Sequence, residues 1–299
     1  MIKNVRMYWM QAITPLHVGS GKGVGFIDMP IIREKVTSWP LVPGSAVKGV
    51  MRDNFHQTKD DERKAFENLI NAAFGRPEDD SGNANSGSLI FTDARIVCLP
   101  IRSLYGTFAF VSSPMVLERL KRDLVAAEYK EIPQIPEPIE NEALHAPGSR
   151  LAIDNKIFFE DLDFTAKQDD DKTNKWAELL AGAVFAKDSR WQSIFKERFV
   201  IVSDNSFNFL SETGTEVASH IRIEDDRKIV AKGALWYEEA LPVETILAGI
   251  VWCDRVYGGN DINQNKILST FCSDSVLELQ IGGKATVGKG RVRCLFTKG

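Results

Sequence analysis

The sequence lacks any apolar run approaching the roughly 20 residues that a membrane-spanning helix requires. Its opening residues, MIKNVRMYWMQAIT, alternate like a strand and lack the basic-then-apolar layout of a secretory signal. These absences argue against a membrane or secreted protein and predict a cytoplasmic one. The 299 residues, 43% of them hydrophobic, are enough to bury a substantial core, and we expect one domain over residues 1–299.

Cysteine is scarce and its spacing is irregular. The four thiols at Cys98, Cys253, Cys272 and Cys294 show no paired spacing of the kind that zinc ligands or redox motifs have. We therefore predict no disulfide and no structural zinc. The thiols are expected to act as small buried hydrophobes.

The sequence also lacks net positive charge, because 37 Lys and Arg stand against 41 Asp and Glu, a formal charge of -4. The distribution is uneven, however. Residues 1–53 hold seven basic and three acidic side chains, and residues 284–299 hold five basic and no acidic ones. If these two ends meet in space, the fold has a basic face on an acidic body, as a protein that follows a phosphate backbone needs. Ordinary solvated charges are the alternative.

The pattern of apolar residues predicts strands mixed with helices rather than a regular alternation of the two. Strands are expected at 5–14, 88–101, 106–113, 156–166, 244–253, 275–283 and 290–296, and helices at 44–57, 61–74, 114–129, 175–185 and 264–272. A hairpin is expected at 218–237 with its turn near 224–227, and loops at 79–87, 131–140 and 167–175. A split β-α-β pattern with large insertions fits this order, so we predict an α+β fold with a ferredoxin-like (RRM-like) core.

The glycine-rich segment at 283–290, GKATVGKG, comes within one residue of a nucleotide-binding P-loop. Gly290 stands where that motif needs a Ser or Thr hydroxyl for magnesium, and too few residues follow for the helix and the acidic magnesium ligand. An NTPase is therefore disfavoured. Consecutive glycines still let backbone N–H groups approach phosphates, and Lys284, Lys289, Arg291 and Arg293 add positive charge. RNA backbone is the better-matched ligand.

The helix expected from Gly44 carries Ser45, Lys48 and Arg52 at spacings of three and four, which places them on one face. The start of a helix offers free N–H groups and a favourable dipole to an anion such as phosphate. A merely capped surface helix is the alternative.

Asp28 follows a loop that carries His17 and several glycines. A carboxylate on such a loop can lean toward a bound strand, hold a divalent ion or help to deprotonate an attacking 2′-hydroxyl. Capping the turn before Pro30 is the alternative role.

Four segments resemble the RNA-binding signature of the repeat-associated mysterious protein (RAMP) superfamily of CRISPR effector complexes. They are LHVGSGKGVGFIDMPIIRE (16–34), LVPGSAVKGVMRDNF (41–55), TDARIVCLPIRSLYGTFAFVSSP (92–114) and IGGKATVGKGRVRC (281–294). The central segment is more similar to the repeated backbone subunit of the type III-B (Cmr) complex than to its type III-A counterpart. The resemblance covers most of the chain.

The resemblance implies a subunit that binds CRISPR RNA (crRNA) and cleaves complementary single-stranded target RNA with a divalent metal, Mg²⁺ or Mn²⁺. Its implied partners are crRNA, target RNA, other Cmr subunits and copies of itself in a helical filament, with no membrane. Sequence recognition would come from base pairing, while the protein reads backbone and shape.

The resemblance also implies roles for individual residues. Asp28 is the implied catalytic and metal-binding residue, with His17 in support and either Glu238 or Glu239 near the site, Glu239 being the one we assign. The implied RNA-binding residues are Ser45, Lys48, Arg52, Gly282, Gly283, Lys284, Lys289, Arg291 and Arg222. A hairpin thumb at about 215–237, with Arg222 and Lys232 reaching toward RNA, would bend the target so that one phosphate is exposed for in-line attack.

Three alternatives to this interpretation stay open. The first is a crRNA scaffold without cleavage activity, in which Asp28 is structural. The second is a type III-A backbone subunit. The third is a stand-alone ribonuclease that processes CRISPR transcripts.

Overall fold

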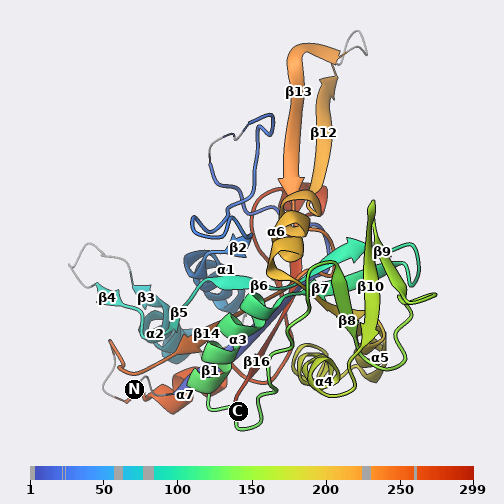
Figure 1. Cartoon of the computed structure of the whole chain (residues 1–299). Coiled ribbons are helices and arrows are strands. Elements are labelled where there is room, and N and C mark those ends of the chain that lie inside the picture. The colour runs from blue at the N-terminus through green and yellow to red at the C-terminus, as the bar shows by residue number, and fades with distance from the viewer. Residues whose placement is uncertain are drawn as a thin grey trace.

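The protein is described by a computed structural model that covers residues 4–21, 23, 25–56, 63–76, 84–223, 230–258 and 261–299. A broad, mainly antiparallel sheet forms the centre of this mixed α/β structure, helices cover both of its faces, and one hairpin projects away from the body (Figure 1). No helix in the described ranges is long and apolar enough to cross a bilayer.

The large sheet has the strand order β15-β16-β1-β14-β6-β7-β11-β8-β10-β9, with β5 beside β14 and β2 beside β6. Its strands are β1 (Val5–Ala12), β2 (Leu41–Val42), β5 (Ile90–Phe91), β6 (Ala94–Arg102), β7 (Phe108–Ser112), β8 (Glu142–His145), β9 (Lys156–Phe159), β10 (Leu162–Gln168), β11 (Phe199–Val202), β14 (Ile246–Trp252), β15 (Leu277–Gln280) and β16 (Arg291–Thr297). The first strand, β1, pairs antiparallel with both β14 and β16, so the two ends of the chain lie side by side in the sheet.

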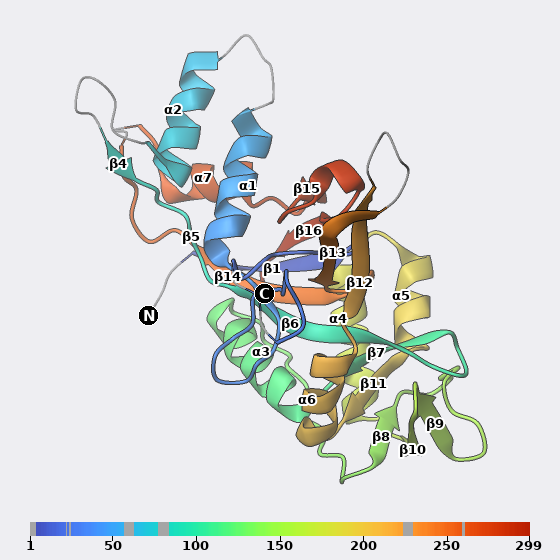
Figure 2. The ribbon, with the colours of Figure 1, turned by 90° about the horizontal axis from the view of Figure 1, so that it is seen from above.

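The core has two layers because successive side chains of a strand point to opposite faces. On β1, Tyr8 and Met10 pack into one layer, while Met7 and Trp9 pack into the other. The first layer is completed by α1 (Gly44–His56), α2 (Arg63–Phe74), α6 (Asp204–Thr213) and α7 (Gln264–Phe271), and the second by α3 (Pro114–Ala126), α4 (Lys172–Val184) and α5 (Ser189–Lys196). Figure 2 shows α1 and α2 at the opposite end of the sheet from β8–β10. All four cysteines are buried within these layers, as predicted.

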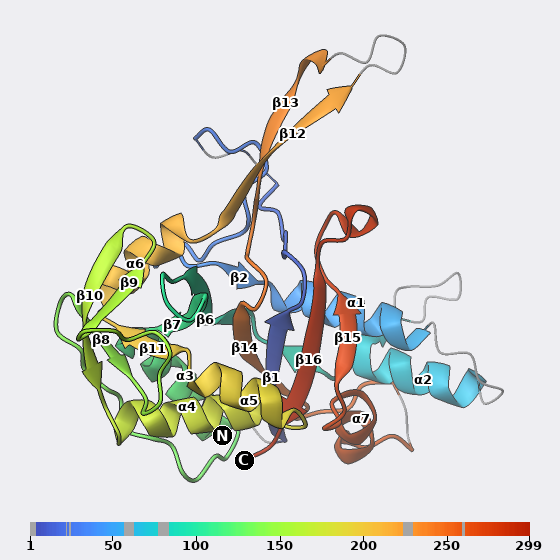
Figure 3. The same cartoon turned by 90° about the vertical axis from the view of Figure 1, so that its right-hand side faces the viewer.

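The projecting hairpin consists of β12 (Glu216–Ile223) and β13 (Val230–Ala240) and contains the hairpin predicted at 218–237. His220 lies opposite Trp236, and their rings stack at 5.7 Å between centroids. The turn predicted near 224–227, and the side chain of Lys232, lie outside the described residues. The base of the hairpin stands beside the chain segment between β1 and β2 (Figures 1 and 3).

Several predicted elements are corrected by the structure. The strand predicted at 88–101 is interrupted at Thr92 and Asp93, because the Asp93 carboxylate accepts a hydrogen bond from the Gly44 N–H at the start of α1 (2.9 Å). The strand predicted at 156–166 is the hairpin β9–β10, which turns at Glu160 with φ at 49°.

Two predicted loops are partly ordered. The stretch 167–175 contains the end of β10 and the start of α4, whose first turn is capped by Asp169. In the stretch 79–87, β4 (Asn85–Ser86) pairs with β3 (Gly75–Arg76), and residues 79–83 lie outside the described ranges. The sequence reading did not identify β8, β11, α5 or α6, whereas the predicted helices at α1, α3 and α7 and the late strands agree with the structure to within a few residues.

Candidate nucleic-acid interface

The predicted meeting of the two chain ends is confirmed. Beyond the β1–β16 pairing, the Gly283 N–H donates to the His17 carbonyl (2.9 Å) and the Gly290 N–H donates to the Pro15 carbonyl (2.9 Å). Gly282 has φ at 83°, and a Cβ at this position would lie 2.3 Å from the His17 carbonyl oxygen. The glycine therefore permits a close contact between the C-terminal loop at 282–290 and the N-terminal loop that no other residue allows.

The N-terminal loop is attached along the open edge of β13. The Asp28 carboxylate accepts from the Tyr237 N–H (2.9 Å), the Met29 N–H donates to the Tyr237 carbonyl (3.0 Å), and the Glu239 N–H donates to the Met29 carbonyl (3.0 Å). Asp28 stays exposed to solvent. One of its oxygens thus binds the edge of β13 while the carboxyl group as a whole remains accessible. The structural role considered for Asp28 was a cap of the turn before Pro30, and the contact with Tyr237 is a different one.

His17 is buried, and its Nδ1 lies 2.6 Å from the Glu239 carbonyl oxygen. A carbonyl can only accept a hydrogen bond, so Nδ1 must carry a proton. In the neutral ring the lone pair is then on Nε2. This fixed tautomer makes Nε2 the atom of His17 that can accept a proton or a hydrogen bond.

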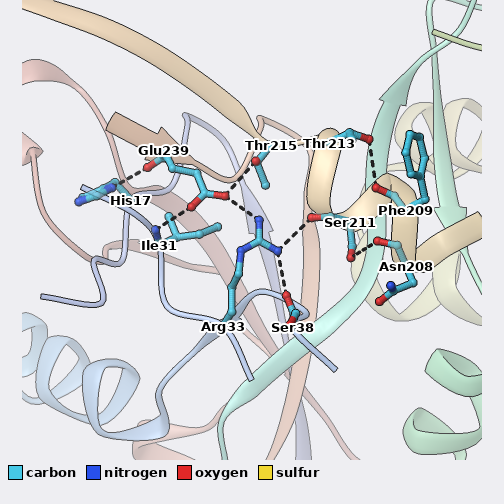
Figure 4. A network of polar contacts seen from close by, with 10 residues as sticks. All are labelled: His17, Ile31, Arg33, Ser38, Asn208, Phe209, Ser211, Thr213, Thr215 and Glu239. Atoms are coloured by element: carbon cyan, nitrogen blue, oxygen red, sulfur yellow. Dashed lines mark hydrogen bonds and ion pairs between the residues drawn. The ribbon is translucent and has the colours of Figure 1, made fainter. Parts of the chain in front are cut away.

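Glu239 lies at the centre of a buried polar network (Figure 4). Its carboxylate accepts from Arg33 Nη2 (2.6 Å), from the Ile31 N–H (3.0 Å) and from Thr215 Oγ1 (2.9 Å). Arg33 Nη1 also donates to the carbonyls of Ser38 (2.8 Å) and Ser211 (3.1 Å). The side chain is 4% exposed and its oxygens are occupied by protein donors, so Glu239 holds the loop, the end of α6 and the hairpin base together.

Glu238 points to the opposite face of β13 and meets the C-terminal loop. Its carboxylate lies 2.6 Å from Lys289 Nζ and 3.2 Å from Lys284 Nζ, although the side chain is only 2% exposed. Burial disfavours the charged carboxylate, but the two ammonium groups outweigh burial and lower the pKa of Glu238 below its ordinary value. Two of the predicted RNA-binding lysines therefore converge on one internal anion.

The predicted basic face of α1 is only partly exposed. Ser45 is exposed in the first turn, but Lys48 is half-buried and its Nζ donates to the Leu89 carbonyl (2.8 Å). Burial lowers the pKa of Lys48. Arg52 is half-buried with its Nε 3.4 Å from His56 Nε2. Ser45 thus opens to solvent directly, whereas the Lys48 ammonium is anchored to the neighbouring chain.

The remaining predicted RNA-binding residues lie on exposed surfaces. Arg291 pairs with Glu278 (2.7 Å), and both side chains are more than half exposed. Arg222 lies on the exposed outer part of β12. Beside the hairpin base, the exposed ring of Phe26 packs edge-on against Tyr237 at 6.3 Å.

The described residues contain no group of three His, Cys, Asp or Glu side chains that could hold a metal ion. Asp28 offers one accessible carboxylate. Mg²⁺ is commonly bound through one or two carboxylates together with substrate phosphates and water, and this donor set fits an ion of that kind only when RNA supplies the remaining oxygens.

The partners of Glu239, and the contact of Asp93 with the start of α1, were not predicted from the sequence. Arg33 and Asp93 lie in segments that resemble the family signature, but neither was given a role, and Thr215 lies outside those segments. Their contacts join positions as much as 206 residues apart in the chain. The one local feature that could have pointed to these contacts is the polar residue Thr215 directly before β12. Such signals are common and do not identify a partner.

Comparison with known proteins assigns the family. The RAMP superfamily model matches residues 9–293. The chain is 34% identical over 289 residues to the CRISPR system Cmr endoribonuclease Cmr4 of Pyrococcus furiosus, which covers 95% of this chain and 92% of that protein. The crystal structure of oligomeric Cmr4 from Pyrococcus furiosus superposes with a TM-score of 0.75 at 26% identity, covering 99% and 98% of the two chains. The cryo-EM structure of the type III-B Cmr-beta complex bound to cognate target RNA contains a chain of the same fold, with a TM-score of 0.75 at 19% identity over 99% and 98% of the chains.

Proposed function

Because the chain belongs to the RAMP superfamily, we propose that it is a backbone subunit of a type III-B CRISPR effector complex, an RNA-guided endoribonuclease that binds crRNA and cleaves complementary target RNA. The observation that carries this proposal is the junction of the two chain ends. The Asp28 loop, the C-terminal glycine loop and the hairpin base meet there through main-chain hydrogen bonds and through the hydrogen bond from the Tyr237 N–H to the Asp28 carboxylate. Identity of 34% along nearly the whole of a Cmr endoribonuclease supports the same function.

The scaffold of this function is a ferredoxin-like core with inserted segments, forming one domain. Its four strands are β1, β6, β14 and β16, in the spatial order β16-β1-β14-β6 with antiparallel neighbours. This is the order that a split β-α-β unit produces when its first and third strands lie in the middle. In the same proposal β12 and β13 form the thumb, inserted before the third strand.

The RNA backbone binds across the C-terminal loop and the start of α1. Support comes from Gly282 and Gly283, which are exposed and have no side chain to keep RNA away, and from the charges of Lys284, Lys289 and Arg291. On α1, Ser45 is exposed and Lys48 and Arg52 follow it on the helix. Arg222 contacts the target side of the duplex from the thumb. Affinity from such contacts is independent of base sequence, while base pairing supplies specificity.

Cleavage takes place at the rim formed by the N-terminal loop. The exposed Asp28 carboxylate approaches the RNA, and Nε2 of His17 is the atom of the ring free to exchange a proton. Glu239 acts through the loop and is a positioning residue. A divalent ion, Mg²⁺ or Mn²⁺, held by Asp28 and RNA phosphates, would neutralise charge that develops at the phosphate. The hairpin supplies the bend in the target that in-line attack requires.

The proposed setting is a cytoplasmic ribonucleoprotein in which copies of this chain stack along one crRNA beside other Cmr subunits. The Pyrococcus furiosus relative forms an oligomeric crystal structure, which supports assembly of copies. A type III-A backbone subunit is the less favoured alternative, since the 34% identical relative is a Cmr protein along nearly its whole length.

The test is an Asp28→Asn chain assembled with guide RNA and the other subunits and supplied with labelled complementary RNA and Mg²⁺. General acid–base or metal-binding residues typically contribute about 10²–10⁴-fold to rate, and we expect a loss in that range with guide binding unchanged. Asp163→Asn, which removes another exposed carboxylate, from an ion pair on the β9–β10 hairpin, serves as the matched control and should cleave normally.

The same assay separates the alternatives. Wild-type cleavage by Asp28→Asn would remove the catalytic assignment and leave a scaffold role. Site-specific cutting of precursor transcript by the isolated chain would instead favour the stand-alone ribonuclease, and we expect none.

A further inference from the structure

Three consecutive residues at the base of β13 each hold a different part of the protein. The Tyr237 N–H binds Asp28 of the N-terminal loop, and the Glu239 side chain binds Ile31 and Arg33 further along that loop. Glu238, between them, binds the C-terminal loop through Lys284 and Lys289. The contacts of Tyr237 and Glu239 organise the proposed cleavage loop. The contact of Glu238 is of another kind, because its partners are charges that RNA would also use.

The Glu238 cluster has the chemistry of an occupied anion site. Two ammonium groups approach one carboxylate that is almost entirely buried, and Lys284 Nζ also lies 6.0 Å above the Trp236 ring. The lysine side chains remain 31% and 15% exposed. Without an anion between them, two neighbouring ammonium groups in a partly buried position would repel each other. Glu238 therefore keeps both lysines in place while part of each lysine side chain stays open to solvent.

We propose that Glu238 is an internal counter-anion that occupies Lys284 and Lys289 in competition with RNA phosphate, and so limits how strongly the chain binds RNA backbone. The inference rests on the proposed function and assigns the regulation of its RNA-binding loop. A carboxylate and a phosphate oxygen accept the same charge-assisted hydrogen bonds from lysine. With one negative and two positive charges, the cluster offers RNA a net charge of one, rather than two.

A limited affinity for RNA backbone suits a subunit whose specificity comes from base pairing. Non-specific affinity for single strands grows with each phosphate that basic side chains neutralise. An internal anion lowers that affinity without removing the lysines from the loop. Glu238 also attaches the C-terminal loop to β13, the strand that binds Asp28 through Tyr237 and His17 through Glu239. The RNA-binding loop and the cleavage loop are therefore held by the same strand.

The experiment measures binding of a fluorescent single-stranded RNA of guide length to the purified full chain over a range of salt concentrations. For single strands, log Kobs falls with log[salt] with a slope of about −0.7 per phosphate neutralised. Glu238→Gln keeps the size of the side chain and removes its charge, so the slope should steepen by about 0.7. Between 50 and 200 mM salt, binding by this variant should fall about 3-fold more than binding by the wild type.

Asp163→Asn is the matched control for net charge. It makes the same change of one unit on the β9–β10 hairpin, away from the C-terminal loop, and should leave the slope at the wild-type value. An equal steepening in both variants would mean that overall charge is responsible and would overturn the proposal. So would an unchanged or shallower slope for Glu238→Gln, since Glu238 would then only maintain the shape of the loop.

A second background removes the risk that Glu238→Gln fails to fold with two unpaired lysines. Lys289→Met leaves Lys284 fully neutralised by Glu238, and the double variant Glu238→Gln, Lys289→Met frees Lys284 with no second lysine beside it. The double variant should show a slope steeper by about 0.7 than Lys289→Met alone. Identical slopes would refute the counter-anion. A wild-type chain that does not bind RNA would refute the proposed function and this inference together, whereas equal slopes in a chain that binds RNA would refute only the inference.

Discussion

Replacing Glu239 by alanine should destabilise the protein severely, because the network of Figure 4 would lose its only carboxylate. Arg33, 22% exposed, would lose its 2.6 Å ion-pair partner, and the Ile31 N–H and Thr215 hydroxyl would lose their acceptor. Removing one partner of a buried ion pair costs about 3–5 kcal/mol. With an unfolding entropy of about 2.1 cal/mol/K per residue over 299 residues, the melting temperature should fall by roughly 5–8 °C.

The assay is thermal unfolding followed by circular dichroism, with Glu278→Ala as the matched control. Glu278 pairs with Arg291 at 2.7 Å, nearly the distance of the Glu239 pair, but its side chain is 65% exposed. Exposed ion pairs contribute about 0–1 kcal/mol, which corresponds to a shift below roughly 2 °C. Equal shifts in the two variants would refute the reasoning, because burial is the property that distinguishes these pairs.

Two further predictions concern the glycine loop and the pH dependence of stability. Gly282→Ala should lower the melting temperature and weaken RNA binding, because its Cβ would lie 2.3 Å from the His17 carbonyl oxygen. Gly288→Ala is the control, since Gly288 has nearly the same φ and its Cβ would have nothing within 4 Å. It adds only the backbone strain and should lower the melting temperature less. Paired hydrogen bonds from Arg119 hold the pKa of Glu34 below its ordinary value, so their stabilisation is complete above about pH 4.3 and is lost as the pH falls through the folded pKa. Glu34→Gln should therefore melt below the wild type at pH 7, and the difference should shrink as the pH falls below about 4.3. A constant difference would contradict the ion-pair explanation.

The sequence predicted those helices and strands whose ends and periodicity are set by residues within the element itself. The helix α3 begins with Ser113 as its cap and Pro114 in its first turn, and both features are visible in the sequence. The strand β11 is a four-residue apolar run, FVIV, and α5 has eight residues, so neither has a periodic pattern long enough to separate strand from helix. The break at Thr92 and Asp93 depends on the Gly44 amide, a partner from another element.

The candidate site was predicted where chemistry depends on residue type and missed where it depends on long-range pairing. Glycines beside basic residues indicated the C-terminal loop, and the contact of Gly283 with His17 confirmed that it meets the N-terminal one. The lysines of that loop were expected to be free for RNA, but Glu238 occupies them. An acidic residue on a strand gives no sign in the sequence of which loop it will face.

At the base of the hairpin, Glu238 and Glu239 face opposite sides of β13, and this alternation restricts which changes of sequence length the protein can accept. A single residue inserted between 238 and 239 would reverse the facing of one of these two residues relative to the other, so that the two carboxylates could not meet Arg33 and the lysines at the same time. Length changes farther out, in pairs of facing residues, would leave that alternation intact. Relatives and engineered forms should accordingly tolerate a longer or shorter outer end of the hairpin, but no insertion or deletion at residues 237–239.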